Sequence, residues 1–397
     1  MLHTFTDIDQ WLVEHQMFWR IEPFLQASFP FQHLEQLPVS LLQWLDGLST
    51  QQILDFKNDS VALREQLSKH IPTFNHPASM VDEHEIPHDV IEIDSRLFSG
   101  VPGRKLEQIK NMGAVCLKHN PHSPWLEWCS GKGYLGRFLS QSSNRAVTSL
   151  EFQAQLCQDG QDYAVQHHLP MNFVHGDAFS TQAKSLCTHD RHGVALHACG
   201  DLHVTLIRNA VESNMKGLTI APCCYHLIRT DDYQPLSSIG KASRLVFSQS
   251  DLRIPLQETV TGGERVNRHR KLEMTYRLAL QHLLAQELDM KEYVPIPSIK
   301  KSLLADGFKF FCLWAAEKKG FSLPQVDWDF YEQCGERLFW RMEALSLIPQ
   351  LFRRPLEQWL VLDRAQYLAE QGYDVDIGTF CSRDITPRNL LIRANRQ

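Results

Sequence analysis

The chain lacks any run of about 18 apolar residues, so no membrane-spanning helix and no membrane partner are expected. Its first residues, Met-Leu-His-Thr-Phe-Thr-Asp-Ile-Asp, lack a basic region followed by an apolar core, which argues against a signal peptide. The ten cysteines are scattered and include no Cys-x-x-Cys pair, so reduced thiols are expected rather than a disulfide framework. Internal repeats and low-complexity tracts are also missing. These absences together predict a cytoplasmic protein.

Positive charge is scarce at the start of the chain. Residues 1–95 hold four Lys/Arg against fifteen Asp/Glu, a balance of −11, whereas the whole chain carries −6, so the remainder carries +5. We therefore do not expect the acidic segment to bind nucleic acid. The later part is compatible with such binding, although its charge alone is weak support.

What the sequence does contain is typical of a globular protein with more than one domain. It has 397 residues, of which 43% are hydrophobic and 22% charged. Apolar residues recur at helical spacing within residues 1–70, for example Ile8, Trp11 and Leu12. The stretch 72–94 holds three prolines and six acids, and is predicted to be a linker.

From Pro124 onward, short apolar runs alternate with helical stretches. Strands are expected at 125–128, 146–151, 171–175, 193–197 and 217–221, with helices between them, such as 134–140, 152–166 and 203–213, and a helix at 104–112 leads into the first strand. This alternation predicts an α/β fold with a doubly wound, mainly parallel sheet.

A helical segment interrupts this pattern before it ends. Helices are expected at 265–288, 299–319 and 327–347, then a helix at 356–371 and strands at 373–380 and 389–394. We interpret the last two strands as an antiparallel pair that closes the sheet. The predicted division is an acidic helical region with linker (1–95), the sheet domain (96–261), a helical insertion (262–350), and the last helix with the closing strands (351–397).

A glycine turn after the first strand is the strongest candidate for a cofactor site. In Glu127-Trp-Cys-Ser-Gly131-Lys132-Gly133 the glycines allow the backbone to approach a ligand, and the helix that follows offers free N–H groups to a carboxylate or phosphate. Lys132 is placed to face the same anionic group.

Further candidates fall at the ends of the next strands, where ligands bind in open α/β sheets. Glu151 ends the second strand and is placed to accept hydrogen bonds from ribose hydroxyls. Asp177, followed by Ala178, comes after the third strand, where a carboxylate can receive an adenine amino group, and His197 ends the fourth. The alternative is that Glu151 and Asp177 only cap helices.

Two cofactor classes compete for this set. Gly131-Lys-Gly133-Tyr-Leu-Gly136 matches the dinucleotide fingerprint of nicotinamide oxidoreductases. However, Glu127 just before the turn would repel a pyrophosphate, whereas it suits the ammonium group of S-adenosylmethionine. We therefore favour S-adenosylmethionine.

Four cysteines follow strands that are neighbours in this topology: Cys129, Cys199, Cys223 and Cys224. They are compatible with buried core thiols, with a catalytic or substrate-contacting loop, or with a metal or iron–sulfur site. Against the metal, adjacent Cys223 and Cys224 in a regular strand point to opposite faces. No metal is predicted.

The motifs at 127–136, Leu196-His-Ala-Cys-Gly-Asp201-Leu, Pro222-Cys-Cys-Tyr-His226 and Thr386-Pro-Arg-Asn-Leu390 resemble a methyltransferase-domain family with Ser-Gly-Lys-Gly, Cys-Gly-Asp and Cys-Cys signatures. The eukaryotic tRNA 2′-O-methyltransferases are more distantly similar. The resemblance covers roughly 100–260 and 370–397 and implies a Rossmann-like class I methyltransferase.

On this resemblance, Glu127, Gly131, Gly133, Glu151 and Asp177 match the cofactor positions of the family, and residues 197–201 and 223–226 match its substrate-side motifs. The full set that we expect to contact the cofactor also includes Cys129, Lys132, Ala178 and His197. The catalytic candidates are Cys223, Asp201 and His226. A neutral imidazole at His226 is available as a base near pH 7, unless it is only a structural histidine. Asp201 would orient the acceptor or cap the following helix.

The expected substrate is RNA. Residues 262–320 hold eleven Lys/Arg against seven Asp/Glu, with Arg265, Arg268, Arg270 and Lys271 close together, which suits phosphate binding. The same charges are also compatible with a solvated helix face. The alternatives are a binding or assembly module without catalysis, a methyltransferase of proteins or small molecules, and a nicotinamide-dependent oxidoreductase.

Overall fold

The computed structural model describes residues 1–28, 34–74, 83–92, 95–120, 122–257 and 263–396. They form two compact units. The first consists of Met1–Glu14, Pro77–Val260 and Arg353–Gln397, and the second of His15–His76 and Thr261–Phe352. The start of the chain is thus divided between the units, whereas the sequence predicted one region over 1–95. The predicted boundary at 261/262 and the linker residues 75–82 and 93–94 lie outside the described residues.

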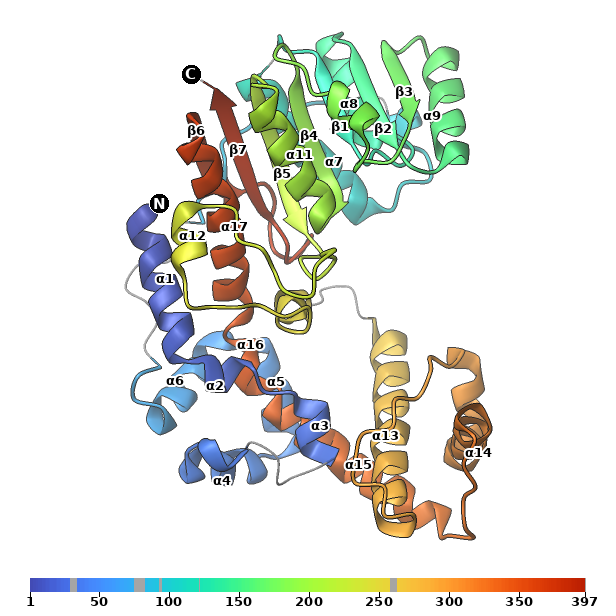
Figure 1. The fold of residues 1–397 in the computed structure, drawn as a ribbon. Coiled ribbons are helices and arrows are strands. Elements are labelled where there is room, and N and C mark those ends of the chain that lie inside the picture. The colour runs from blue at the N-terminus through green and yellow to red at the C-terminus, as the bar shows by residue number, and fades with distance from the viewer. Residues whose placement is uncertain (29–33, 75–82, 93–94, 121, 258–262, 397) are drawn as a thin grey trace. The chain divides into compact units, whose positions relative to one another are not determined.

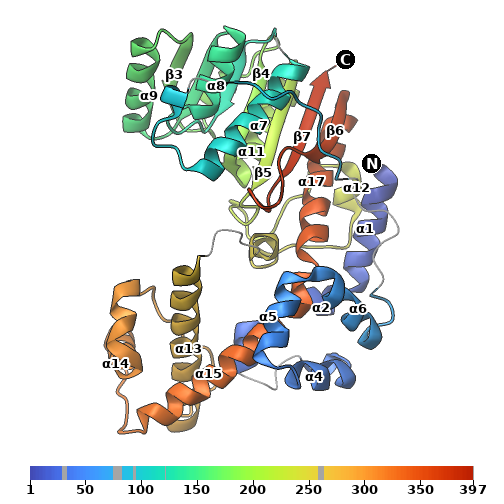
Figure 2. The same ribbon diagram turned by 180° about the vertical axis from the view of Figure 1, so that it is seen from behind.

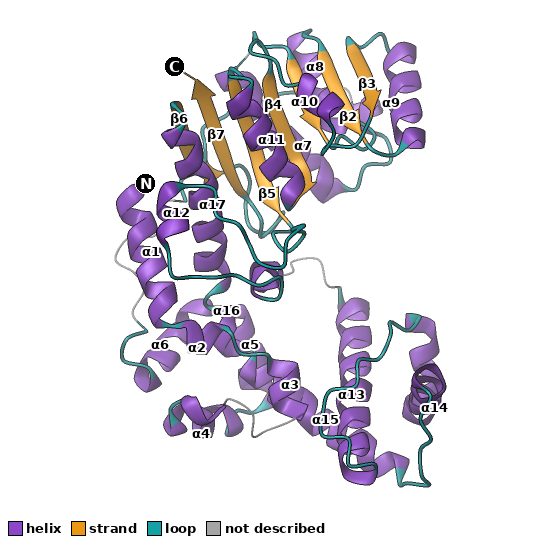
Figure 3. Ribbon diagram, viewed as in Figure 1, coloured by secondary structure: helices purple, strands orange, loops and turns teal. Residues whose placement is uncertain are grey.

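The first unit is built on a seven-stranded sheet in the order β3-β2-β1-β4-β5-β7-β6 (Figures 1 and 3). Its strands are β1 (Trp125–Trp128), β2 (Val147–Glu151), β3 (Met171–His175), β4 (His192–Cys199), β5 (Gly217–Cys223), β6 (Tyr373–Thr379) and β7 (Leu390–Arg396). β1 to β5 pair in parallel, and β7 pairs antiparallel with both β5 and β6. The predicted α/β fold and the antiparallel closing pair are confirmed.

Helices cover both faces of this sheet (Figures 1 and 2). α7 and α8 lie on one face, and α11 and α17 on the other. The helices of the unit are α1 (Leu2–Glu14), α7 (Gly103–His119), α8 (Tyr134–Ser143), α9 (Ala154–Gln166), α10 (Thr181–Ser185), α11 (Asp201–Glu212), α12 (Ser238–Ala242) and α17 (Arg353–Glu370), with 3₁₀ turns η2 (Ser95–Phe98) and η3 (Asp251–Gln257).

The core beneath α7 and α8 explains why these segments are helical. Ile109 and Met112 of α7 and Leu135 and Phe138 of α8 recur three residues apart, so each pair faces the strands and is buried against Trp125 of β1. Since each such side chain contributes about 1.5–3 kcal/mol when fully buried, this layer holds the glycine turn rigidly between β1 and α8.

The second unit contains helices alone among its described residues. They are α2 (Gln16–Trp19), α3 (Pro23–Ser28), α4 (Val39–Asp46), α5 (Thr50–Asn58), α6 (Ser60–His70), α13 (Glu264–Glu287), α14 (Gly307–Lys319), α15 (Trp328–Leu345) and α16 (Leu347–Gln350), with η1 (Leu34–Gln36) and η4 (Lys301–Asp306). Tyr276, Leu280, Phe308 and Phe311 form the centre of one of its cores.

One predicted helix of this unit is shorter than expected. Residues 299–319 were expected to be one helix, but 301–306 form a 3₁₀ turn and α14 begins only at Gly307. Gly307 has φ +90°, outside the helical region, so the chain changes direction there. Among the described helices, none is both long and apolar enough to cross a membrane.

Candidate functional site

The glycine turn between β1 and α8 has the backbone conformation that its sequence predicts. Cys129, Gly131 and Gly133 all have positive φ, at 56°, 58° and 71°. A Cβ atom on Gly133 would lie 2.4 Å from the Phe173 ring, whereas one on Gly131 would meet nothing within 4 Å. Gly133 is therefore required for packing, and Gly131 leaves open space where a ligand can approach the backbone.

Glu127 lies beneath this turn instead of on its surface. Its side chain is buried, and its carboxylate accepts a hydrogen bond from Ser149 Oγ at 2.7 Å and bonds from the backbone N–H groups of Gly136 and Leu135. Burial raises the pKa of Glu127 to about 7. The residue thus holds the start of α8 onto β1 and β2, and its direct contact with the ammonium group stays a prediction.

Glu151, at the end of β2, connects to the same turn. Its Oε2 accepts the backbone N–H of Gly131 at 2.8 Å, and its Oε1 accepts that of Gln153 at 2.9 Å. A carboxylate oxygen has two lone pairs, so each can accept one more donor, such as a ribose hydroxyl.

Asp177 and Ala178 follow β3. The carboxylate of Asp177 is exposed and accepts the backbone N–H of Phe179 at 3.0 Å, while Ala178 is buried beside it. Glu151 thus also bonds at the N-cap of α9, which is Gln153, and the carboxylates of both residues keep lone pairs for a ligand.

Lys132 and Cys129, the remaining cofactor candidates of the glycine turn, lie near charged side chains of other elements. Lys132 Nζ lies 3.8 Å from an Asp159 carboxylate oxygen on α9. Burial raises the pKa of the Cys129 thiol to about 12. The negative charges of Glu151, Cys199 and Asp177 contribute to the same shift, in that order. Cys129 therefore lies near both Glu151, which bonds to the glycine turn, and Cys199 of β4.

A bulge in β4 determines where Cys199 points. Leu196 pairs with Ala221, but Cys199 pairs with Cys223, so β4 has one residue more than β5 over this interval. The extra residue is accommodated at His197, whose φ is +69°. His203 of α11 supports the bulge, because its Nδ1 bonds to the carbonyl oxygen of Ala198 at 2.8 Å.

A second backbone irregularity follows β5. Cys224 has φ +48°, so the strand does not continue, and the chain turns back until Leu227 N–H donates to the Cys224 carbonyl at 3.0 Å. Gly200 accommodates this loop, since a Cβ atom there would lie 2.1 Å from the Leu227 carbonyl oxygen. Asp201 N–H donates to that same oxygen at 3.0 Å.

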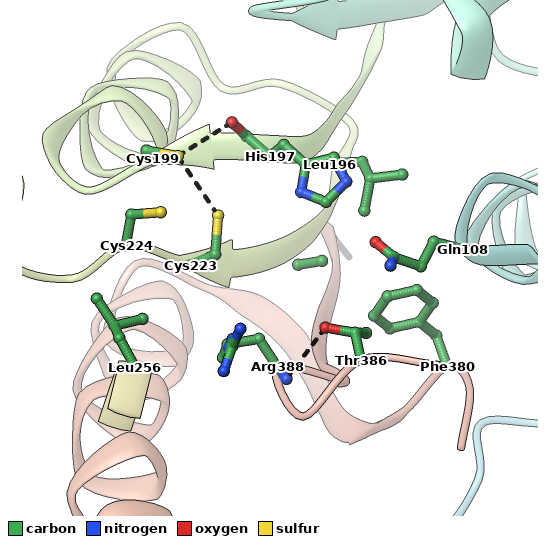
Figure 4. A pocket seen from close by; sticks show the side chains of 11 residues that line it. Gln108, Leu196, His197, Cys199, Cys223, Cys224, Leu256, Phe380, Thr386 and Arg388 are labelled. Atoms are coloured by element: carbon green, nitrogen blue, oxygen red, sulfur yellow. Dashed lines mark hydrogen bonds between the residues drawn. The ribbon is translucent and has the colours of Figure 1, made fainter. Parts of the chain in front are cut away.

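The two irregularities bring three thiols together (Figure 4). The Sγ atoms of Cys199, Cys223 and Cys224 all lie within 4.8 Å of one another, and those of Cys199 and Cys223 are 3.7 Å apart. Hydrogen bonds from the other two thiols lower the pKa of Cys224, with a further contribution from His226 and Arg388. The same bonds and burial raise the pKa of Cys223, so Cys224 is the first to ionise.

These thiols line a pocket of about 250 Å³ at the carboxyl ends of β4 and β5. Figure 4 shows the side chains that surround it. They come from α7, β4, β5, η3 and the segment between β6 and β7: Gln108, Leu196, His197, Cys199, Ala221, Cys223, Cys224, Leu256, Phe380, Thr386 and Arg388. Desolvation, with Lys105 nearby, lowers the pKa of His197, although the residue keeps an exposed surface.

The three catalytic candidates are not equivalent in this arrangement. Cys223 lines the pocket. Asp201 instead accepts the backbone N–H of Arg229 at 2.7 Å, and so holds the loop after β5 in place. His226 does not line the pocket, and its buried Nδ1 has no hydrogen-bond partner among the described residues.

Several pocket residues were not identified from the sequence, namely Gln108, Phe380, Thr386 and Arg388. The motif Thr386-Pro-Arg-Asn before the last strand contributed to the family resemblance, but the sequence did not indicate what its residues do. A buried network fixes this segment: Arg354 donates to Glu357 at 2.7 Å and to Asn389 at 2.9 Å, and Tyr225 donates to Glu357 at 3.3 Å. Both walls of the pocket are therefore anchored on α17.

The residues present fit S-adenosylmethionine. Space is open over Gly131, Glu151 has acceptor capacity beside it, and the Asp177 carboxylate is exposed at the next strand end. A ligand across these strand ends would extend toward Cys129 and the pocket.

Comparison with known proteins supports the same conclusion. Residues 104–231 match the model of a family described as a methyltransferase domain. No curated protein matches the chain significantly.

Three solved structures are distantly similar. They are PH0226 from Pyrococcus horikoshii OT3 (9% identity, 41% of this chain and 84% of that chain, TM-score 0.27), coclaurine N-methyltransferase bound to N-methylheliamine and SAH (13%, 79% and 94%, 0.28), and a putative class I S-adenosylmethionine-dependent methyltransferase from Listeria monocytogenes (12%, 55% and 73%, 0.23). At these TM-scores, the similarity carries no functional argument.

The family match thus decides between the two cofactor classes that the glycine turn left open. Residues 104–231, 128 of the 397, match a methyltransferase domain, and the methyl donor that this match implies is S-adenosylmethionine.

Proposed function

We propose that this protein methylates RNA in the cytoplasm, with S-adenosylmethionine as the methyl donor. The observation that supports methyl transfer most strongly is that the glycine turn and the thiol-lined pocket lie at the carboxyl ends of neighbouring parallel strands, β1, β4 and β5. The ten free cysteines support a reducing compartment.

Within this proposal, the chain's own residues position two reactants. Gly131, Glu151 and Asp177 would hold the donor, which supplies an electrophilic methyl group on a sulfonium. The pocket would hold the acceptor, and its limited volume suits one nucleotide group turned out of a strand. Alignment of the two contributes most to such a reaction, and proton removal is needed only when the acceptor is a hydroxyl.

The proton acceptor would be an imidazole. His197 lines the pocket, and its lowered pKa keeps the ring neutral at pH 7. His226 was the first candidate from the sequence, but it lies outside the lining. We therefore rank His197 above His226.

Support for RNA as the substrate comes from α13. Arg265 and Arg268, in its first two turns, are exposed. Their neighbours are already engaged, because Arg270 pairs with Glu343 at 2.8 Å and Lys271 with Glu336 at 3.5 Å. The first two arginines are thus the better candidates for phosphate contacts. The resemblance to tRNA 2′-O-methyltransferases points to the same substrate class.

Two measurements on the full-length protein test the proposal. Calorimetric titration with S-adenosylmethionine, with NADH alongside, should show micromolar binding of the first and none of the second. Transfer of labelled methyl groups from the donor should then label cellular RNA and leave the protein and small-molecule fractions unlabelled. Label in protein alone would contradict RNA, and absence of donor binding would contradict methyl transfer.

A binding or assembly module without catalysis is the second candidate. The observation that favours it is that two of the three expected catalytic residues, Asp201 and His226, do not line the pocket. Donor binding and RNA binding without methyl transfer, unchanged in Cys223→Ala, would support this module over the enzyme.

A further inference from the structure

The thiols of Cys199, Cys223 and Cys224 come together only because the backbone departs from regular strand geometry twice. In a regular strand, successive side chains point to opposite faces. Leu196 and Ala221 are register partners, so their side chains lie on the same face of the sheet. In regular strands, Cys223, two residues after Ala221, would stay on that face, whereas Cys199, three residues after Leu196, would point to the other face. The bulge at His197 brings Cys199 back to the face of Cys223. The positive φ of Cys224 likewise turns its side chain to the side of Cys223 at the end of β5.

Such conformations are costly, on the order of 1–3 kcal/mol each for residues other than glycine. Surrounding contacts maintain both of them. His203 bonds to the carbonyl of the bulge, and Gly200 leaves room for the loop after Cys224. Tyr225, next to Cys224, is anchored on Glu357. The fold thus maintains a three-thiol arrangement that a regular sheet would separate.

The spacing of the sulfurs matches a single tetrahedral ion. A Zn–S bond of about 2.3 Å places two sulfurs of a tetrahedron about 3.8 Å apart. The separation of Cys199 and Cys223 Sγ is 3.7 Å, and all three sulfurs lie within 4.8 Å. In a 4Fe–4S cluster each cysteine binds a different iron, and a 2Fe–2S cluster takes two cysteines on each of two irons, so three thiols around one point suit a single ion better than either cluster.

We propose that Cys199, Cys223 and Cys224 bind one Zn²⁺ ion, whose fourth coordination position opens into the pocket. Three protein ligands and one open position are the arrangement of reactive zinc sites, whereas structural sites use four protein ligands. Thiolate ligands also select zinc over magnesium, calcium or manganese.

The charges around the site suit this ion. Three thiolates and Zn²⁺ carry a net charge of −1, and both Arg388 and His226 act electrostatically on Cys224. The fourth position would face a pocket that also presents His197, Thr386 and Arg388, so a water molecule or a soft donor atom of the acceptor can occupy it. This proposal does not depend on the acceptor being RNA.

The test is metal analysis of the full-length protein, purified under reducing, anaerobic conditions. We expect about one zinc per chain by elemental analysis, and X-ray absorption should show about three sulfur neighbours at about 2.3 Å. Co²⁺ exchanged into the site should give the intense sulfur-to-cobalt absorption of tetrahedral thiolate coordination.

Cys199→Ser and Cys224→Ser should each weaken Zn²⁺ binding by on the order of 100-fold, in a competition titration with a chelator. Cys157→Ser is the matched control, because Cys157 lies on α9 and its Sγ donates to the Glu151 carbonyl, a bond that a serine hydroxyl preserves. Circular dichroism identifies any variant that fails to fold. If a variant does not fold, the number of sulfur neighbours in the X-ray absorption spectrum of the wild type tests the three-cysteine site instead.

Three results would overturn the proposal. The first is wild type that takes up no zinc when the ion is added to the reduced protein. The second is zinc retained equally by Cys199→Ser, Cys224→Ser and the control. The third is iron with inorganic sulfide in place of zinc.

Discussion

Two residues with positive φ, His197 and Cys224, determine which way the pocket thiols point. The sequence argument against a metal assumed that Cys223 and Cys224 alternate as in a regular strand. Neither residue is a glycine, so nothing in the local sequence signals a left-handed conformation, and contacts from α11 and α17 impose it. The sequence pattern therefore predicted that the cysteines lie at strand ends, but it could not predict that three of the thiols meet.

Glu127 should make stability depend on pH. Burial raises the pKa of its carboxyl from 4.5 to about 7, so the folded protein binds a proton that the unfolded chain releases between these values. Stability from this group is complete below pH 4.5 and is lost as the pH rises through 7. Glu127→Gln removes this dependence. Between pH 5 and pH 8, the wild type should lose on the order of 3 kcal/mol more than the variant, measured by urea unfolding. Parallel pH profiles would show that Glu127 is ionised in the fold.

Asp177→Ala should weaken S-adenosylmethionine binding on the order of tenfold, because it removes one exposed acceptor at the strand end. Calorimetric titration measures the change, and the melting temperature should stay constant. Asp190→Ala is the control, since this exposed aspartate accepts a local bond from Thr188 at 2.7 Å before β4, at the opposite edge of the sheet. Equal affinities in the two variants would remove Asp177 from the donor site.

At the scale of elements, the loop after β5 depends on the space at Gly200. Gly200→Ala would place a Cβ atom 2.1 Å from the Leu227 carbonyl oxygen, at a residue whose φ is +55°. We expect a loss of stability on the order of 2–4 kcal/mol and displacement of Cys224. Thermal unfolding and the reaction rate of the Cys224 thiol with a thiol reagent measure these effects. Gly103→Ala, where a Cβ atom meets nothing within 4 Å, should change stability by less than about 0.5 kcal/mol.

The strands were predictable because they are short apolar runs between clear turn signals. Trp125–Trp128 and Met171–His175 match their predicted bounds, and the other five differ by one or two residues at either end. Of the longest helices, α13 and α15 also match within one or two residues, whereas α17 begins at Arg353 instead of residue 356 and α7 continues to His119 instead of ending at residue 112. The failures lie where backbone geometry is decided by distant contacts: the β4 bulge held by His203, and the 3₁₀ turn that replaces the start of one helix. Glu127 was recognised as important, but its burial under α8 requires the packing of three elements.

At the scale of the whole molecule, each unit is assembled from separate segments of the chain, and the arginines proposed to contact RNA lie in the second unit. If the second unit binds RNA, Arg265→Ala/Arg268→Ala should weaken binding uniformly across RNA sequences. The slope of log K against log salt should fall by about two, one for each lost phosphate contact. Filter binding at several salt concentrations measures this slope. Lys291→Ala is the control, because Lys291 already pairs with Asp289 at 2.9 Å. An unchanged slope in the double variant would exclude these arginines from the RNA site.

The insertion between β5 and β6 has a consequence for synthesis of the chain. β5 is complete at Cys223, but its neighbour β7 ends at Arg396 and is the last strand of this sheet to be synthesised. Until then, one edge of the parallel sheet has unpaired N–H and C=O groups, and exposed edges invite intermolecular pairing. At 5–20 residues per second, roughly ten to thirty seconds separate the two strands. The nascent protein is thus open to aggregation while the residues between β5 and β7 are translated, and a premature stop before or within Leu390–Arg396 would leave the sheet unclosed.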